Sequence, residues 1–87
     1  MTVTVELFGI PRQRADTAAA RVEARCLAEA VAALSREFPA LAEACFDGGR
    51  LRPGYLANLN GERFVSDPAT PLADGDALLI LSADAGG

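Results

Sequence analysis

The sequence predicts one α+β domain, in which a mixed sheet of four to five strands is crossed by one main helix. Three observations lead to this prediction. Residues 2–7 alternate between polar and apolar side chains, residues 27–38 carry an apolar stripe at helical spacing, and residues 55–65 and 77–81 carry strand patterns around turn signals. Eighty-seven residues are enough for one small core and no large internal pocket.

The N-terminal segment is expected to be a half-buried strand. Its apolar members recur at every second position, and they are Val3, Val5 and Leu7. Phe8 then falls on the face opposite this inward set, because side chains alternate along a strand. Gly9, Pro11 and the polar residues 12–14 follow, and we expect them to end the strand in a loop.

Residues 16–38 allow two interpretations. Their many alanines favour one long helix by propensity. Alternation over residues 18–24 instead favours an outer strand, with the helix starting near Cys26. The second half is helical in both cases, because an apolar stripe spaced four, three and four residues apart is formed by Leu27, Val31, Leu34 and Phe38. Pro39 ends this helix at or before Phe38.

A second short helix is expected over residues 40–45, with Leu41 and Cys45 pointing inward. Residues 46–50 are expected to form a turn rather than a phosphate loop, because no strand precedes their two glycines and no lysine follows them. Further along, Leu72 is expected to be a buried anchor.

The last third of the chain predicts a hairpin followed by a central strand. Asn60-Gly61 is a preferred pair for a tight type I′ turn, and it would join residues 55–59 to residues 62–65. The run 77–81 is apolar without interruption, as expected for a strand covered on at least one face.

The charge of the chain excludes several classes of partner. Its net charge is −4 and its pI is near 4.6, so its surface repels nucleic acid, whose binding depends on Lys and Arg. No basic amphipathic helix suggests binding to a membrane surface. The N-terminal segment has neither the basic region nor the long apolar run of a signal peptide, and we expect a cytoplasmic protein.

The residue types that are missing limit the chemistry that this chain could do alone. It has no His, no Lys and no Trp, so it offers no Ser-His or Cys-His pair, no imidazole ligand and no lysine Schiff base. Its two cysteines, Cys26 and Cys45, match no metal-binding spacing. Buried small hydrophobes are the expected role for them, and a redox role is the alternative. We therefore expect no metal site, no bound cofactor and no enzyme activity of the chain by itself.

The C-terminal segment 82–87 has only small side chains and ends in Gly86-Gly87. We expect residues 1–81 to form the domain and residues 82–87 a flexible tail. Because glycine has no Cβ, such an end can enter a slot too narrow for other residues. Six extended residues reach at most about 20 Å. The tail is therefore either a carboxyl terminus presented to another protein or an ordinary frayed end.

These features together resemble the MoaD/ThiS-like sulfur-carrier family, whose members, including the small subunit of molybdopterin synthase, are ubiquitin-like β-grasp proteins. The resemblance spans nearly the whole chain, and residues 72–87 are its most specific part. It is carried by Leu7-Phe8-Gly9, Phe38-Pro39, Asn60-Gly61, Pro71-Leu72, Asp74-Gly75-Asp76 and Gly86-Gly87. It implies a β-grasp fold, and with it the division of residues 16–38 into a strand and a helix.

The resemblance also implies a function. The C-terminal carboxylate of Gly87, preceded by Gly86, would be adenylated by a ubiquitin-activating-type adenylyltransferase that uses ATP, and then converted to a thiocarboxylate. The sulfur would pass to the large subunit of molybdopterin synthase or an equivalent acceptor enzyme. The partner enzymes would bind the tail residues Ser82, Ala83, Asp84 and Ala85 in a narrow slot.

Three departures from the family pattern leave the pathway open. Cys26 stands near the position where Thr or Ser usually caps the helix, and Ser82-Ala83 replace a common proline. Residues 46–54 form a longer segment than in the smallest thiamine-type carriers, which favours the molybdopterin and cysteine-biosynthesis types. Alternatives are sulfur transfer for thiamine, cysteine or secondary metabolites, a ubiquitin-like modifier, and an interaction domain with an inert tail.

Docking to such partners is expected to use apolar side chains on the solvent face of the sheet. Phe8, Phe64 and Leu81 are predicted to form an exposed patch beside the tail, since aromatic anchors often dominate protein interfaces. The alternative is that all three belong to the core. The lack of lysine fits a carrier, because a surface amine could attack an activated C-terminus. The alternative explanation, which we favour, is a GC-rich genome that prefers arginine.

Overall fold

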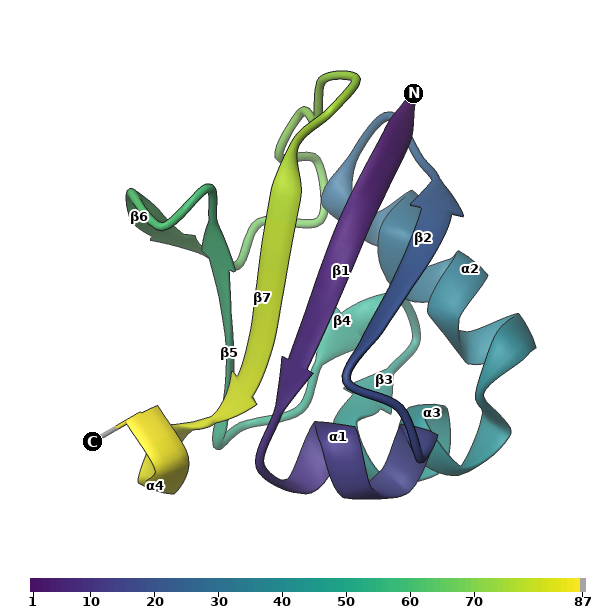
Figure 1. The fold of residues 1–87 in the computed structure, drawn as a ribbon, viewed down its shortest axis with the longest axis vertical. Coiled ribbons are helices and arrows are strands. Elements are labelled where there is room, and N and C mark those ends of the chain that lie inside the picture. The colour runs from purple at the N-terminus through teal and green to yellow at the C-terminus, as the bar shows by residue number, and fades with distance from the viewer. Residues whose placement is uncertain (87) are drawn as a thin grey trace.

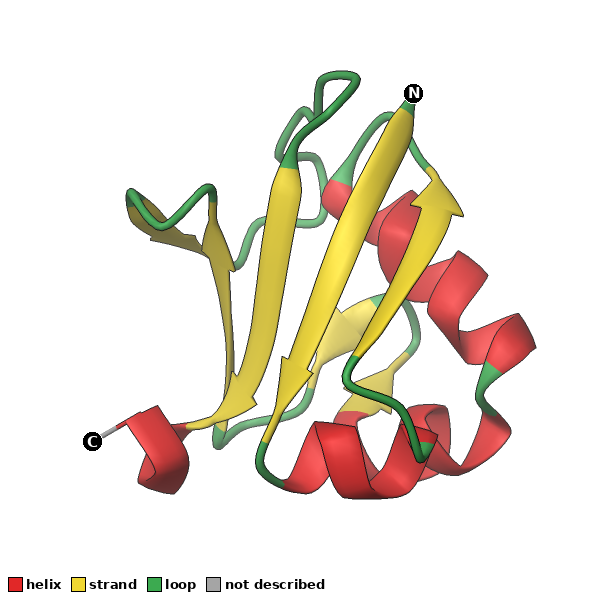
Figure 2. Ribbon diagram, in the orientation of Figure 1, coloured by secondary structure: helices red, strands yellow, loops and turns green. Residues whose placement is uncertain are grey.

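The computed structural model describes residues 1–86 of the chain (Figures 1 and 2). The elements follow the chain in the order β1 (Thr2–Phe8), α1 (Ile10–Ala15), β2 (Ala19–Glu23), α2 (Leu27–Glu37), α3 (Pro39–Cys45), β3 (Phe46–Asp47), β4 (Arg50–Leu51), β5 (Tyr55–Leu59), β6 (Arg63–Val65), β7 (Ala77–Ser82) and α4 (Ala83–Gly86).

The main sheet has five strands in the order β2-β1-β7-β5-β6. The central pair, β1 and β7, is parallel, and the other pairs are antiparallel. Helix α2 runs across one face of this sheet (Figure 1). The predicted mixed sheet with one main helix is therefore confirmed, and so is the division of residues 16–38 into a strand and a helix.

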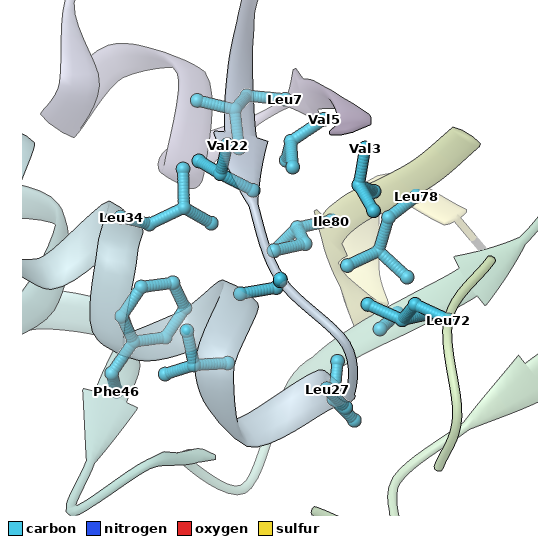
Figure 3. Close-up of a cluster of buried hydrophobic side chains, with 14 of the residues drawn as sticks. Val3, Val5, Leu7, Val22, Leu27, Leu34, Phe46, Leu72, Leu78 and Ile80 are labelled. Carbon is cyan, nitrogen blue, oxygen red and sulfur yellow. The ribbon is translucent and has the colours of Figure 1, made fainter. Parts of the chain in front are cut away.

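The core lies between α2 and the face of the sheet that it covers, which we call the inner face (Figure 3). The side chains predicted to point inward are all buried there, namely Val3, Val5, Leu7, Leu78 and Ile80. From α2 they meet Leu27, Val31 and Leu34. Each such side chain contributes about 1.5–3 kcal/mol relative to an exposed position. Leu72 is buried at the edge of this cluster, as predicted.

The hairpin between β5 and β6 has the predicted turn. Asn60 and Gly61 both have positive φ angles, 58° and 69°, as a type I′ turn requires. Asn60 has a second role that its sequence pattern does not indicate. Its Nδ2 donates to Asp76 Oδ1 at 3.0 Å, and its Oδ1 accepts from the Ala77 amide at 2.8 Å. The turn is thereby attached to the start of β7.

The segment after β1 corrects the sequence-based expectation of a loop, because Ile10–Ala15 form helix α1. Proline is favourable in the first turn of a helix, where its missing N–H would have no intrahelical acceptor. Pro11 and Ala15 are both buried, and α1 contacts α3. Tertiary packing therefore makes a helix of a stretch whose Gly, Pro and Arg residues predict a loop.

Two further expectations are corrected in detail. Residues 46–50 contain more than a turn, because β3 and β4 pair with each other as a small separate sheet. Strand β7 includes Ser82, which is buried, so the strand ends one residue later than predicted. No helix in the described part of the chain is long and apolar enough to cross a membrane.

Candidate functional site

The base of the tail is held by both neighbours of the central strand. Leu81 is in register with Phe8 of β1, and Ser82 is in register with Tyr55 of β5. The Ala83 amide then donates a hydrogen bond to the Gly54 carbonyl at 2.8 Å. The chain therefore leaves the sheet at a fixed point and in a fixed direction.

Beyond this point, Ala83–Gly86 form the short helix α4, within the segment expected to be a flexible tail. Ala83 and Asp84 are exposed. A helix rises about 1.5 Å per residue, against more than 3 Å for an extended chain, so α4 shortens the reach of the tail. Gly87, the predicted reacting residue, lies outside the described residues, and the roles of Gly86 and Gly87 stay predictions.

The face of the sheet opposite α2, which we call the outer face, carries the predicted aromatic side chains. Phe8 is 49% exposed and Phe64 is 62% exposed, and they are two of the three large hydrophobic side chains found exposed in the described chain. Large apolar side chains left in water on one face are typical of an interaction site. The exposure predicted for these two residues is confirmed, whereas their binding to a partner stays a prediction.

Leu81 does not have the predicted exposure, since only 7% of its surface is accessible. The register places it between Phe8 on one side and Leu56 on the other, in one row across the outer face. It is also absent from the main core cluster. Its neighbours on the outer face cover it. Leu81 therefore lies beside the exposed Phe8 and offers almost no contact surface of its own.

A shallow groove of about 440 Å³ lies beside the base of the tail. Its lining includes Leu56 and Phe64 of the outer face, together with Arg52, Pro53 and Tyr55 near the tail. The groove therefore joins Leu56 and Phe64 in one apolar surface, and Phe8 is exposed on the same face beyond the nearly buried Leu81. Sequence reasoning missed Leu56, although its place next to Leu81 follows once the hairpin is paired with the last strand.

Cys45, the last residue of α3, is buried in the core, as predicted. Burial raises the pKa of its thiol, and burial also raises the pKa of the neighbouring Tyr55 hydroxyl. A thiol with a raised pKa is a poor nucleophile at neutral pH. The burial of Cys45 therefore agrees with its expected role as a small hydrophobic residue of the core.

Other kinds of site are not found in the described residues. No group of three or more His, Cys, Asp or Glu side chains is placed to hold a metal ion in this part of the chain. The N-terminus of α2 is also occupied, because the amides of Leu27 and Ala28 donate to the carbonyls of Thr70 and Pro68, both at 2.9 Å. The tail and the outer face are thus the features of the described chain that suggest a function.

Comparison with known proteins gives no match to the sequence among family models or curated proteins. Solved structures do match. Small archaeal modifier protein 1 (SAMP1) from Haloferax volcanii has a TM-score of 0.82 and 25% identity over 100% of both chains. CysO from Mycobacterium tuberculosis has a TM-score of 0.79 and 25% identity, covering 93% of this chain and 98% of its own.

A third match comes from a protein complex. A chain in the complex of subunits 1 and 2 of molybdopterin-converting factor from Helicobacter pylori has a TM-score of 0.66 and 26% identity, covering 94% of this chain and 93% of its own. The predicted resemblance and the β-grasp fold are therefore confirmed.

Proposed function

We propose that this chain, which has the β-grasp fold of the ubiquitin-like MoaD/ThiS-type proteins, is a sulfur carrier that works through its C-terminal carboxylate. The observation that carries the proposal is the position of the tail. It continues the central strand of the sheet, it starts at a point fixed by two neighbouring strands, and it leaves beside the exposed Phe8, on the face where Phe64 is also exposed. A partner that docks on the outer face would find the tail at a constant distance and direction.

The chemistry follows from the weakness of a carboxylate as an electrophile. An ATP-dependent adenylyltransferase of the ubiquitin-activating type would join the Gly87 carboxylate to AMP and release pyrophosphate. A sulfur nucleophile would then attack the acyl carbon, AMP would leave, and the product would be a thiocarboxylate. In this scheme the chain supplies position and reach, which lower the barrier by proximity. The adenylyltransferase supplies ATP binding.

Within this role, we propose that the acceptor is the large subunit of a molybdopterin synthase. The likeness to a chain in the two-subunit Helicobacter pylori molybdopterin-converting factor supports a partner of this kind. The alternative is sulfur transfer for cysteine or another small-molecule product, since CysO, also a sulfur carrier, matches with a TM-score of 0.79. The acceptor is therefore tested by supplying each acceptor enzyme with the charged carrier and measuring loss of sulfur from the carrier.

Intact-mass spectrometry tests the carrier role. The purified chain is incubated with the adenylyltransferase, ATP and a sulfide source. We expect a mass gain equal to the difference between sulfur and oxygen, and no gain when ATP is omitted. Deletion of Gly87 should abolish the gain while leaving the urea unfolding midpoint unchanged, because the residue comes after α4, the last element of the described chain. A wild-type chain that never gains this mass would refute the role.

A second candidate is a ubiquitin-like modifier, favoured by the likeness to SAMP1, a small archaeal modifier protein. The same C-terminus would then form an amide with a lysine of another protein. The two roles separate in a lysate that contains ATP. A modifier gives covalent adducts of higher mass that resist reducing agent, whereas a carrier gives only the small mass gain.

A further inference from the structure

A small hollow lies on the outer face among β1, β7 and β5. Its volume is about 170 Å³, and its lining residues are Glu6, Asn58, Gly61, Ala77, Leu78 and Leu79. Sites for small-molecule ligands usually measure about 300–1,000 Å³. This hollow is therefore of a size for one side chain of another protein.

The register of the sheet places one polar side chain on each side of Leu79, which forms an apolar floor. Glu6 is in register with Leu79, and Leu79 is in register with Asn58, so the three residues form one row across neighbouring strands. With strands about 4.8 Å apart, Glu6 and Asn58 stand about 10 Å from each other. Phe64 continues the same row beyond Asn58.

Asn58 is poorly satisfied in the free chain. Its Oδ1 is buried, and no donor for it is found in the described residues. Leaving a buried acceptor without a donor costs about 1–3 kcal/mol, so an apolar residue would suit this position better if only the fold mattered. Such unpaired groups call for an explanation, and a donor supplied by a partner is one.

Glu6, at the other end of the row, is exposed. The ion pairs found in the described chain involve Glu23 and Glu29 and leave Glu6 out. The hollow thus has the Glu6 carboxylate on one side and the Asn58 amide, whose oxygen is buried in the free chain, on the other, on a chain whose net charge is −4. Its charge is complementary to a cation.

We propose that this hollow receives an arginine side chain of the protein that docks on the outer face. The aliphatic stem would lie on Leu79, and the guanidinium would donate to the Glu6 carboxylate and to Asn58 Oδ1. Rotation of the Asn58 amide about χ2, a soft torsion, would turn its oxygen toward the guanidinium. The proposal rests on the proposed function only in assuming that a partner docks on this face.

The geometry favours arginine over lysine. A guanidinium is a rigid fork with five donors, so it can serve two acceptors on opposite sides at once, whereas an ammonium is a compact point charge. Phe64, next in the row after Asn58, is exposed, and an aromatic ring within about 6 Å of the guanidinium would attract the same cation.

The first test needs no partner. N-acetyl-arginine methylamide is titrated into the ¹⁵N-labelled chain, with the neutral isostere N-acetyl-citrulline methylamide as the matched probe. We expect weak binding, with a Kd in the range of about 1–100 mM. Shifts should concentrate on Glu6, Leu79 and the Asn58 side-chain amide, and citrulline should cause much smaller ones. Equal shifts with both probes, or shifts elsewhere, would overturn the proposal.

The second test uses variants in the charging reaction with the adenylyltransferase. Glu6→Gln should lower kcat/KM about tenfold, because it removes a charge-assisted hydrogen bond. The control is Glu37→Gln, which makes the same charge change on an exposed residue of α2 and should leave kcat/KM unchanged. If both variants charge equally well, the hollow has no part in docking.

Asn58→Leu separates docking from folding. It should raise the urea midpoint, because the unpaired acceptor is gone, and it should also lower kcat/KM about tenfold, because the partner arginine loses an acceptor. Parallel loss of stability and activity would indicate a structural role and refute the proposal.

If arginine binds selectively but the wild-type chain never gains sulfur, the carrier role fails while the proposed arginine site stands. If sulfur is gained and the variants behave as wild type, the reverse holds.

Discussion

Adjacent side chains in one row of the outer face differ in exposure, as seen for Phe8, Leu81 and Leu56. They stand in one row across β1, β7 and β5, yet Leu81 is buried and Phe8 is half exposed. Alternation along a strand identifies which face a residue is on. Alternation does not show how much of a side chain is covered by its neighbours, because those neighbours depend on which strands pair. This is why the exposure of Phe8 was predictable from the sequence and the burial of Leu81 was not.

This division predicts different effects for two alanine substitutions. Phe64→Ala should leave the free energy of unfolding nearly unchanged, since the ring is mostly in water, and should reduce charging about tenfold as a lost anchor. Leu81→Ala should cost about 2 kcal/mol of stability. The measurements are urea unfolding and the rate of ATP-dependent mass gain. Arg63→Ala, on the same strand as Phe64, is the control and should affect neither.

Asp76 gives a prediction for pH. Hydrogen bonds from the Ala73 amide at 2.8 Å and from Asn60 Nδ2 at 3.0 Å lower the pKa of its carboxyl group below the ordinary value. Its contribution to stability is therefore complete above the pKa of the unfolded chain, about 3.9, and is lost as pH falls through the lower pKa of the folded chain.

Asp76→Asn should accordingly destabilise the protein by about 1 kcal/mol at pH 7, since the new amide has one oxygen and cannot accept from both Asn60 Nδ2 and the Ala73 amide as the carboxylate does. The urea midpoint of this variant should also fall less than that of wild type when the pH is lowered from about 7 to about 3. An identical fall in both proteins would show that this carboxylate does not contribute to the acid sensitivity of the fold.

At the scale of elements, the sequence predicted those whose signal is local. The alternation of β1, the stripe of α2 and the Asn60-Gly61 turn each depend on residues close in sequence, and each is confirmed. The division of residues 16–38 is different, because alanine propensity favours one helix. It followed from the family resemblance, and the physical cause is that β2 pairs with β1 in an antiparallel register.

Helix α1 is the element that local patterns could not predict. It starts after Gly9, whose φ of 72° and ψ of −135° lie in a region that residues with a Cβ rarely adopt. Gly9→Ala should therefore destabilise the protein by about 2 kcal/mol in urea unfolding. Gln13→Ala, within α1 and exposed, is the control and should be neutral or slightly stabilising, because alanine favours helix. A Gly9→Ala chain as stable as wild type would mean that the junction relaxes without strain.

At the scale of the whole molecule, the parallel pairing of β1 with β7 separates the two ends of the chain (Figure 1). Phe8 is in register with Leu81, so Met1 lies about 25 Å along the strands from the base of the tail, at about 3.3 Å per residue. The five residues after Ser82 reach at most about 17 Å. The Met1 amine, which forms an ion pair with Glu23 at 3.5 Å, is therefore beyond the reach of the tail of the same molecule.

This separation gains meaning from the absence of lysine, because the sequence then has no side-chain amine. An activated Gly87 would have no side-chain amine of its own molecule to attack it. Arg52→Lys places an amine two residues before Gly54, whose carbonyl holds the Ala83 amide. With the adenylyltransferase and ATP but no sulfur donor, this variant should form an internal amide with release of AMP, seen as the loss of one water from the intact mass.

Arg25→Lys is the matched control for this self-acylation. Arg25 follows Ala24, whose amide donates to the Met1 carbonyl, so a lysine there is as far from the tail as the N-terminus is. It should keep the mass of the free acid. If both variants lost water, the tail would have to reach across the length of the central strands. The position of Ser82 at the end of β7 would then not direct the C-terminus. If neither did, activation would end with the adenylate still enclosed by the partner, and the absence of lysine would carry no protective role.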